Sequence, residues 1–92
     1  MGGDNIKYNI LKKRSIHRNN PTDHLLSTAL DIGEVMLKSG AEISRVENTI
    51  ERICRAYGAL HVDVFSITSV IIAAIRMKSG EYSSQVRRIQ GA

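Results

Sequence analysis

The sequence predicts an α+β domain in which a two-helix hairpin packs on a three-stranded antiparallel β-meander, giving an ααβββ two-layer sandwich. Apolar residues recur every three or four positions up to Tyr57, which is the period of a helix buried along one face. Beyond that point the period changes to two, and β-branched residues predominate. Single glycines, Gly40, Gly58 and Gly80, separate these segments. A helical pair and a sheet each need a partner surface, and each supplies it to the other.

The positive charge of the chain is concentrated in its first twenty residues. The whole sequence carries a net charge of +4, with a pI near 9.6. Residues 1–20 hold five basic side chains against Asp4, so residues 21–92 carry eight basic and eight acidic side chains and are formally neutral. We therefore expect a flexible basic leader over residues 1–20 and a single α+β domain over residues 21–92.

The first helix is expected from Pro21 to about Ser39. Asn20 is suited to accept from early backbone N–H groups as the N-cap, and Pro21 at the first helical position removes a donor that the helix does not need. Gly40 can take a positive φ and end the helix. The expected apolar stripe comprises Leu25, Leu26, Ala29, Leu30, Gly33, Met36 and Leu37, with Asp31, Glu34 and Lys38 on the opposite, solvated face.

The second helix is expected to open at Ser44 and to end at Tyr57. Ser44 and Glu47 have the spacing of a capping box, in which each side chain satisfies a backbone donor near the other residue. Glu51 and Arg55 are correctly ordered for an i,i+4 ion pair. The expected buried stripe comprises Val46, Ile50, Ile53, Cys54 and Tyr57.

Three strands are expected, at about His61–Ser66, Ser69–Met77 and Tyr82–Ile89, with a tight turn at residues 78–81. The middle strand is apolar on both faces over Val70–Ile75, which indicates a central position covered on both sides or by a second subunit. We therefore predict a homodimer through the sheet.

The segment from Leu30 to Glu47 reads Leu-Asp-Ile-Gly-Glu-Val-Met-Leu-Lys-Ser-Gly-Ala-Glu-Ile-Ser-Arg-Val-Glu. It resembles the opening of the threonine/serine exporter family, in which one helix ends in Ser-Gly-Ala-Glu and the next opens with Arg-Val-Glu. The likeness continues through residues 50–53, 56–59 and 62–65, Thr68, the apolar strand to Ile75, and Arg87-Arg88, so it covers residues 24–90.

The resemblance implies a hydrophilic N-terminal region followed by transmembrane helices that carry small hydroxy amino acids or related metabolites outward. The longest apolar run here, Val70 to Ile75, has six residues against the roughly 20 that span a bilayer. We therefore expect a soluble fragment of a larger membrane protein, at the cytoplasmic face of the cell membrane, with a non-catalytic assembly or regulatory role. Its expected partners are the transmembrane part of the same or a partner protein and a second copy of itself.

A candidate binding site lies at the turn between the helices. Glu42, Ser44, Arg45 and Glu47 gather beside the free N-terminus of the second helix, whose unpaired N–H groups and dipole attract carboxylates. The structural interpretation of the same residues is that Ser44 and Glu47 cap the helix while Glu42 and Arg45 pair on the surface.

Three further residues are candidates for polar contacts. Thr68 belongs to a hydroxyl-rich bend between the first two strands, which is also ordinary turn chemistry. Arg87 and Arg88 lie on opposite faces of the last strand, so one guanidinium is expected to point towards the helices and to meet Glu42 or Glu47, unless both have a surface role.

The sequence predicts no catalytic residue, no metal site and no cofactor. Cys54 lies on an apolar stripe, where an inert buried thiol is the ordinary outcome. His24 and His61 lack a second ligand at metal spacing. The seven glycines are scattered singly except for Gly2-Gly3, so no phosphate-binding loop is present in the sequence.

Two alternative functions remain open at this point. Residues 26–57 can be drawn as a helix-turn-helix beside a basic tail, but Glu47 and Glu51 on the second helix would repel phosphates, so no nucleic acid is expected as a partner. A small hydrolase is the other alternative, and its main objection is that no His/Asp pair stands at a spacing that could activate a serine.

Overall fold

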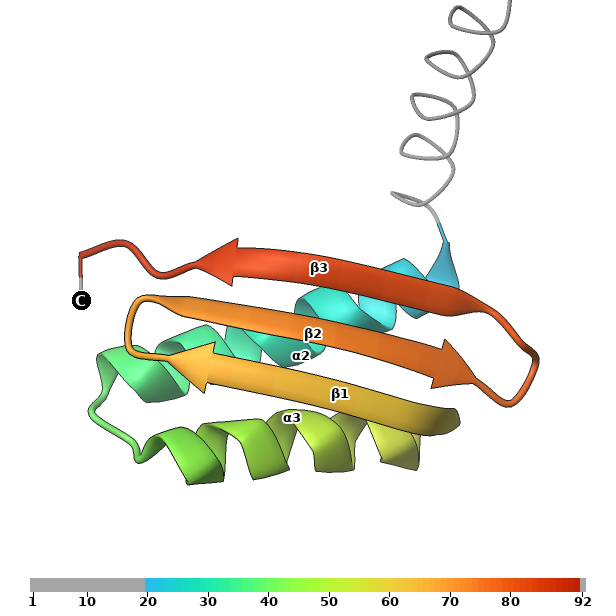
Figure 1. Cartoon of the computed structure of the whole chain (residues 1–92), viewed down its shortest axis with the longest axis horizontal. Helices are drawn as coiled ribbons and strands as arrows, with labels where there is room; N and C mark the ends of the chain where they lie inside the picture. The colour runs from blue at the N-terminus through green and yellow to red at the C-terminus, as the bar shows by residue number, and fades with distance from the viewer. Residues whose placement is uncertain (1–19, 92) are drawn as a thin grey trace, which may run out of the picture.

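Two helices lie against one face of a three-stranded antiparallel sheet in the computed structural model, which describes residues 20–91 (Figure 1). The helices are α2 (Pro21–Lys38) and α3 (Ile43–Ala56), and the strands are β1 (Ala59–Ile67), β2 (Val70–Met77) and β3 (Tyr82–Arg88). The strand order is β1-β2-β3, so β2 is central. The predicted ααβββ architecture is confirmed. The predicted basic leader falls almost wholly on residues 1–19, outside the described residues.

Helix α2 begins and ends as the sequence predicts. The Asn20 side chain accepts a hydrogen bond from the backbone N–H of Thr22 at 2.8 Å, and Pro21 occupies the first helical position. At the other end Ser39 is the C-cap, and Gly40 has a φ of +86°. Both ends depend on residues next to one another in the chain, which is why the sequence locates them correctly.

The N-cap of helix α3 lies two residues before Ser44, the predicted N-cap, and the predicted capping box is wrong. Its N-cap is Glu42, whose side chain makes no capping hydrogen bond. Ser44 therefore lies within the first turn, where its hydroxyl cannot cap the helix. The carboxylate of Glu47 instead accepts a hydrogen bond from the backbone N–H of Ser66 in β1, at 2.8 Å. A longer-range partner thus replaces the local one that the capping-box pattern implies.

The C-terminal part of α3 follows its prediction more closely. Arg55 Nε lies 2.9 Å from Glu51 Oε2, which confirms the i,i+4 pair. The prediction that Tyr57 closes the buried stripe is wrong, because its side chain is 72% exposed. Tyr57 is the C-cap residue, where the backbone leaves the helix before turning into β1, so it no longer follows the helical period.

The sheet has a tight turn at Thr68-Ser69, and its register is regular except for one shift in β1. Ile67 pairs with Val70 across that turn, and a register shift lies between Ala59 and His61. On the other side Val70 pairs with Arg88. Each strand therefore presents alternate residues to the helices and to the opposite surface.

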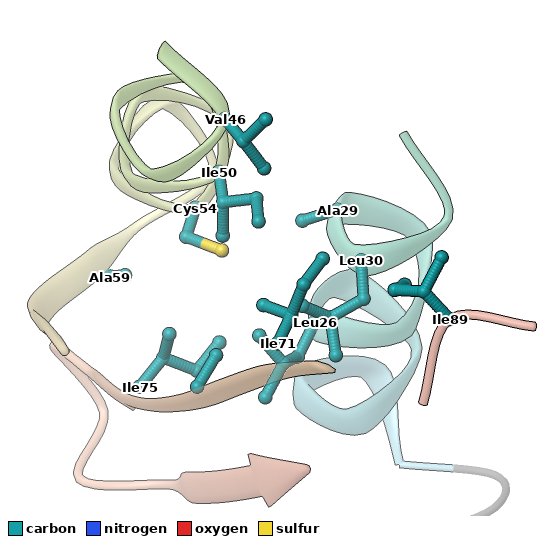
Figure 2. Close-up of a cluster of buried hydrophobic side chains, with 11 residues drawn as sticks. Leu26, Ala29, Leu30, Val46, Ile50, Cys54, Ala59, Ile71, Ile75 and Ile89 are labelled. Carbon is teal, nitrogen blue, oxygen red and sulfur yellow. The ribbon is translucent and has the colours of Figure 1, made fainter. Parts of the chain in front are cut away.

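The core lies between the helices and the inner face of the sheet. Its side chains project from both helices and from β2 towards one another (Figure 2). Its buried members are Leu26, Ala29, Leu30, Val46, Ile50, Cys54, Ala59, Ile71, Ala73, Ile75 and Ile89. Gly33 of α2 allows the closest approach, since a Cβ atom there would lie 2.8 Å from Ile50 Cδ1 and 3.2 Å from Ile71 Cδ1. This aliphatic core matches the sequence-based expectation.

Candidate functional site

The residues predicted to form a site at the inter-helix turn do not converge on a common point. Glu42, Ser44 and Arg45 are exposed, and the backbone N–H groups of Arg45 and Val46 donate to the carbonyl oxygen of Glu42 at 3.1 Å. Within the described residues, no ion pair joins Glu42 to Arg45. Glu47 points to β1 instead. The turn therefore presents an ordinary solvated helix start.

Glu47 and Ser66 connect α3 to the turn between β1 and β2. Because Ile67 and Val70 form the last hydrogen-bonded pair before the turn, the N–H of Ser66 points away from β2, and Glu47 satisfies it. The Ser66 hydroxyl donates to the carbonyl oxygens of Ile67 at 3.0 Å and Val70 at 3.3 Å. Thr68, by contrast, is exposed. These contacts shape the turn and protect part of an edge strand.

Arg87 points towards the helices as predicted for one of the two arginines, but its partners are on α2. Its Nη1 atom lies 2.8 Å from Asp31 Oδ1 and 2.9 Å from Glu34 Oε1. Glu34 also pairs with Lys38 at 3.2 Å. The expectation that the inward arginine meets Glu42 or Glu47 is therefore wrong, because β3 packs beside α2 rather than α3.

The hydrogen bonds that Glu34 accepts from Arg87 and Lys38 lower the pKa of its carboxyl group. The face of α2 predicted to be solvated is therefore partly covered by β3 at this point, and Glu34 is half-buried. Arg88, the other candidate, is exposed on the opposite surface of the sheet. The two arginines thus do not act together.

A second set of polar contacts, which the sequence did not reveal, ties the start of α2 to β3. The Thr22 hydroxyl donates to Glu81 Oε1 at 3.0 Å, and the Ser83 hydroxyl donates to Asp23 Oδ1. The Gln85 side-chain amide donates to the carbonyl oxygen of Asp23 at 2.9 Å. About sixty residues separate these partners in the chain, so a pattern of neighbouring residues in the sequence could not predict these hydrogen bonds.

A groove of about 490 Å³ opens between the N-terminal end of α2 and the C-terminal end of α3. Leu25, Ile53 and Tyr57 supply apolar wall, and the polar groups come from Thr22, His24, Thr28, Ser79 and Glu81. Thr22 and Glu81 already bond to each other, and within the described residues no side-chain hydrogen bond joins His24 to Thr28 or to Ser79.

The side chains with potential for covalent or metal chemistry lie apart from one another. Cys54 is fully buried, and this burial raises the pKa of its thiol to about 11, which keeps it protonated near neutral pH. His24 and His61 are exposed on other elements. Over residues 20–91, no three His, Cys, Asp or Glu side chains are grouped so that they could hold a metal ion.

The surface feature that stands out is the outer face of the sheet, which points away from both helices. In Figure 1 α2 lies behind the strands, α3 lies along β1 and mostly below it in the view, and no described segment crosses in front of the strands. We define the outer face by the residues that share this side in the register: His61, Asp63, Phe65 and Ile67 of β1, Val70, Ile72, Ala74 and Arg76 of β2, and Tyr82, Ser84, Val86 and Arg88 of β3.

The centre of the outer face is apolar and accessible. Phe65, Ile72 and Val86 stand side by side in one row across the three strands. Their side chains are 59%, 47% and 65% exposed, and Ile67 beside them is 46% exposed. The sequence pointed to this surface through the double-sided apolar pattern of β2, but it could not say which face the helices would leave open.

Comparison with known proteins gives one match. The sequence model of the family described as putative threonine/serine exporter matches residues 27–92. No curated protein and no solved structure matches the chain. Among the helices of the described residues, neither α2 nor α3 is long and apolar enough to cross a membrane.

Proposed function

Because this chain belongs to the threonine/serine exporter family, we propose that it is the soluble, cytosolic N-terminal domain of an exporter-type membrane transporter and serves its assembly without catalysis of its own. In this proposal the transport step takes place in transmembrane helices that are separate from residues 20–91. The domain contributes a rigid surface that holds parts of the transporter together.

The accessible apolar centre of the outer face is the observation that carries the proposal. A row of Phe65, Ile72 and Val86, each about half exposed or more, costs free energy when it faces water. Soluble monomers rarely leave a contiguous apolar patch of more than a few hundred Å² uncovered, and such patches commonly mark interaction sites. A partner that covers this row recovers that free energy.

The polar groups of the domain support a role without catalysis. Glu47, Arg87 and Asp23 make hydrogen bonds that join helices to strands, so their chemistry is used in holding the fold. Cys54 is buried and protonated near neutral pH. A hydrolase would need an accessible nucleophile activated by a base. The hydroxyl groups that bond to carboxylates here, Thr22 with Glu81 and Ser83 with Asp23, belong to buried residues, and within residues 20–91 no hydrogen bond links either pair to a histidine side chain.

The arrangement also gives no support to nucleic-acid binding through α3. That helix is held against β1, with Glu47 engaged by Ser66, and Arg55 is paired with Glu51. Its other two arginines, Arg45 and Arg52, are exposed and make no ion pair within residues 20–91. Two such side chains beside Glu51 supply little of the positive charge that binding to a phosphate backbone requires.

The proposal is tested in an exporter that carries this region joined to its transmembrane helices. Val86→Asp places a charge in the apolar row of the outer face, on the edge strand β3, and Val35→Asp places the same charge on the exposed side of α2. Both valines are 65% exposed, so the two variants are matched. We expect Val86→Asp to lower threonine export from preloaded cells at least fivefold and Val35→Asp to leave it unchanged.

A third variant tests the absence of catalysis. Ser44 is exposed near the start of α3 and makes no cap, so Ser44→Ala should leave export unchanged at equal protein level. Unchanged export in Val86→Asp would contradict the assembly role. Loss of export in Ser44→Ala, with normal protein level, would support a hydrolase instead.

A further inference from the structure

We infer that the partner on the outer face is a second copy of this chain, so that two domains stack sheet against sheet about a two-fold axis. The inference rests on the proposed assembly role and names the partner for it. It is carried by the distribution of charge on the outer face and by the size of that face.

The outer face combines an apolar patch, which runs from the row of Phe65, Ile72 and Val86 to Ile67 and Val70 at the β1–β2 turn, with charged residues around that patch. The central row holds Phe65, Ile72 and Val86 and carries no charge. Arg76 lies towards one end of the face, and Arg88 lies at the other. Interfaces typically place charged residues at the rim, where they stay hydrated, and apolar side chains at the centre.

This distribution favours a second copy over a charged partner. In a two-fold dimer the centre of a face meets the centre of the same face, so a charge there would meet its own like charge. The uncharged central row avoids that repulsion. Asp63 and Arg76 lie on the same half of the face, so rim charges of both signs are available where the copies meet.

The size of the outer face limits how much surface a dimer can bury. Three strands about 4.8 Å apart and about eight residues long at a rise of about 3.4 Å cover roughly 400 Å² in projection. A standard stable interface buries about 800 Å² on each partner. The face is therefore large enough for a weak dimer, with a dissociation constant of roughly 10–100 µM in solution. Attachment of both copies to one membrane assembly raises their effective concentration and favours pairing.

The first test measures the mass of the full chain in solution by light scattering and sedimentation equilibrium over a concentration series up to about 1 mM, which exceeds the expected dissociation constant. We expect the mass to rise from 10.2 kDa towards twice that value for the natural chain and for Val35→Asp. Val86→Asp should weaken dimerisation at least tenfold. Because the central row is uncharged, the dissociation constant should change little between low and high salt.

Three results of this test would contradict the inference. The first is a natural chain that stays monomeric at about 1 mM, ten times the weakest expected dissociation constant. The second is equal dimerisation of the Val86→Asp and Val35→Asp variants. The third is association that requires anionic lipid vesicles and disappears at high salt, since this would assign the face to a membrane surface through Arg76 and Arg88.

The second test uses a thiol at the centre of the face. Ile72 lies on the middle strand in the central row, so a two-fold axis through the centre brings it next to Ile72 of the second copy. Ile72→Cys should form a cross-linked dimer with a short thiol-specific linker, whereas Val35→Cys should not. The native Cys54 is fully buried and does not interfere. Equal cross-linking of the two variants would contradict a face-to-face arrangement.

The outcomes separate this inference from the proposed function. If the natural chain is monomeric but Val86→Asp still lowers export, the assembly role stands, and the inference that the partner is a second copy of the chain is wrong. If the chain dimerises through the outer face but Val86→Asp leaves export unchanged, the dimer stands and the assembly role fails.

Discussion

At the scale of single residues, Glu47 shows how one carboxylate can determine the contact between a helix and a strand. Its carboxylate accepts a hydrogen bond from the backbone N–H of Ser66, a residue that is only 3% exposed. Without that acceptor the Ser66 N–H would be left unpaired on the side of β1 that faces away from β2. An unpaired buried donor lowers the free energy of unfolding by about 1–3 kcal/mol.

This geometry predicts different effects for two glutamates on α3. Glu47→Ala should lower the free energy of unfolding by about 1–3 kcal/mol, because it leaves Ser66 N–H unpaired. Glu47→Gln retains an acceptor oxygen and should cost less. Glu51→Ala removes only an exposed ion pair and should cost at most about 0.5 kcal/mol. Urea denaturation of the three variants measures the order, and a Glu47→Ala protein as stable as Glu51→Ala would contradict it.

The ion pair between Arg87 and Glu34 leads to a prediction of how the stability of the domain depends on pH. Its guanidinium bonds to Glu34, and this bond, with that from Lys38, lowers the pKa of the Glu34 carboxyl group from 4.5. A carboxyl group whose pKa is lower in the folded state stabilises the fold above its unfolded pKa. That stabilisation is therefore present above about pH 4.5 and is lost as the pH falls through the folded pKa.

Arg87→Gln should accordingly be less stable than the natural chain at pH 7, and the difference should shrink as the pH falls below about 4.5. Arg88→Gln serves as the control, since no ion pair involves Arg88 within residues 20–91. Thermal unfolding from pH 7 to pH 3 at low protein concentration measures both. A stability difference that persists unchanged at pH 3 would show that Arg87 acts by packing rather than through Glu34.

At the scale of secondary-structure elements, the sequence predicted what local chemistry decides. Asn20 and Pro21 start α2, and the change of period after Gly58 marks the strands, because each signal involves neighbouring residues. The capping box at Ser44 failed for a different reason. The capping-box pattern pairs Glu47 with the backbone N–H of Ser44, but in the structure its carboxylate accepts from the backbone N–H of Ser66 in β1. A single sequence does not reveal that competition.

The candidate site was less predictable than the fold for the same physical reason. Strand alternation predicted that one of Arg87 and Arg88 points towards the helices, where Glu42 or Glu47 was the expected partner unless both arginines had a surface role. The actual partners depend on which helix covers β3, and they are Asp31 and Glu34 of α2. The bonds of Thr22 with Glu81 and of Ser83 with Asp23 also join residues that only the tertiary structure brings together. The alternating pattern of the strands defined two faces, and only the packing of the helices showed which one stays open.

The contact between α2, α3 and β2 depends on the missing side chain of Gly33. A Cβ atom there would lie 2.8 Å from Ile50 Cδ1, which is too close, and Ile50 is fully buried and cannot move into solvent. Overpacking of this kind costs roughly 1–3 kcal/mol, whereas replacing a helical glycine by alanine gains about 1 kcal/mol. We therefore expect Gly33→Ala to be destabilising by about 1 kcal/mol in net.

A double-mutant cycle isolates this contact. Ile50→Val removes the atom closest to the new methyl group but leaves Ile71 Cδ1, 3.2 Å from it, so Gly33→Ala should cost less in the Ile50→Val background than in the natural chain. Denaturant unfolding of the four proteins gives the coupling energy. If Gly33→Ala costs the same in both backgrounds, Ile50 is not what requires a glycine at this position.

At the scale of the whole molecule, the fold buries one face of a small sheet and leaves the other without cover from residues 20–91 (Figure 1). A chain of 92 residues has a thin margin of stability, because it buries a smaller share of its surface than a larger domain does. Covering the outer face with a second copy would therefore add to the free energy of unfolding as well as organise an assembly.

The proposed dimer predicts that the midpoint of thermal unfolding rises with protein concentration, because association stabilises the folded state by mass action. With a dissociation constant of roughly 10–100 µM, the gain between about 1 µM and 1 mM should be about 1–2 kcal/mol, or ~5–10 °C for a domain of this size. Val35→Asp should show the same rise, whereas Val86→Asp, which dimerises at least tenfold more weakly, should show a smaller rise. At the lowest concentration the natural chain and Val86→Asp should unfold at similar temperatures, since both are then monomers and Val86 is 65% exposed. A midpoint of the natural chain that does not depend on concentration would mean that the outer face gains nothing from a second copy.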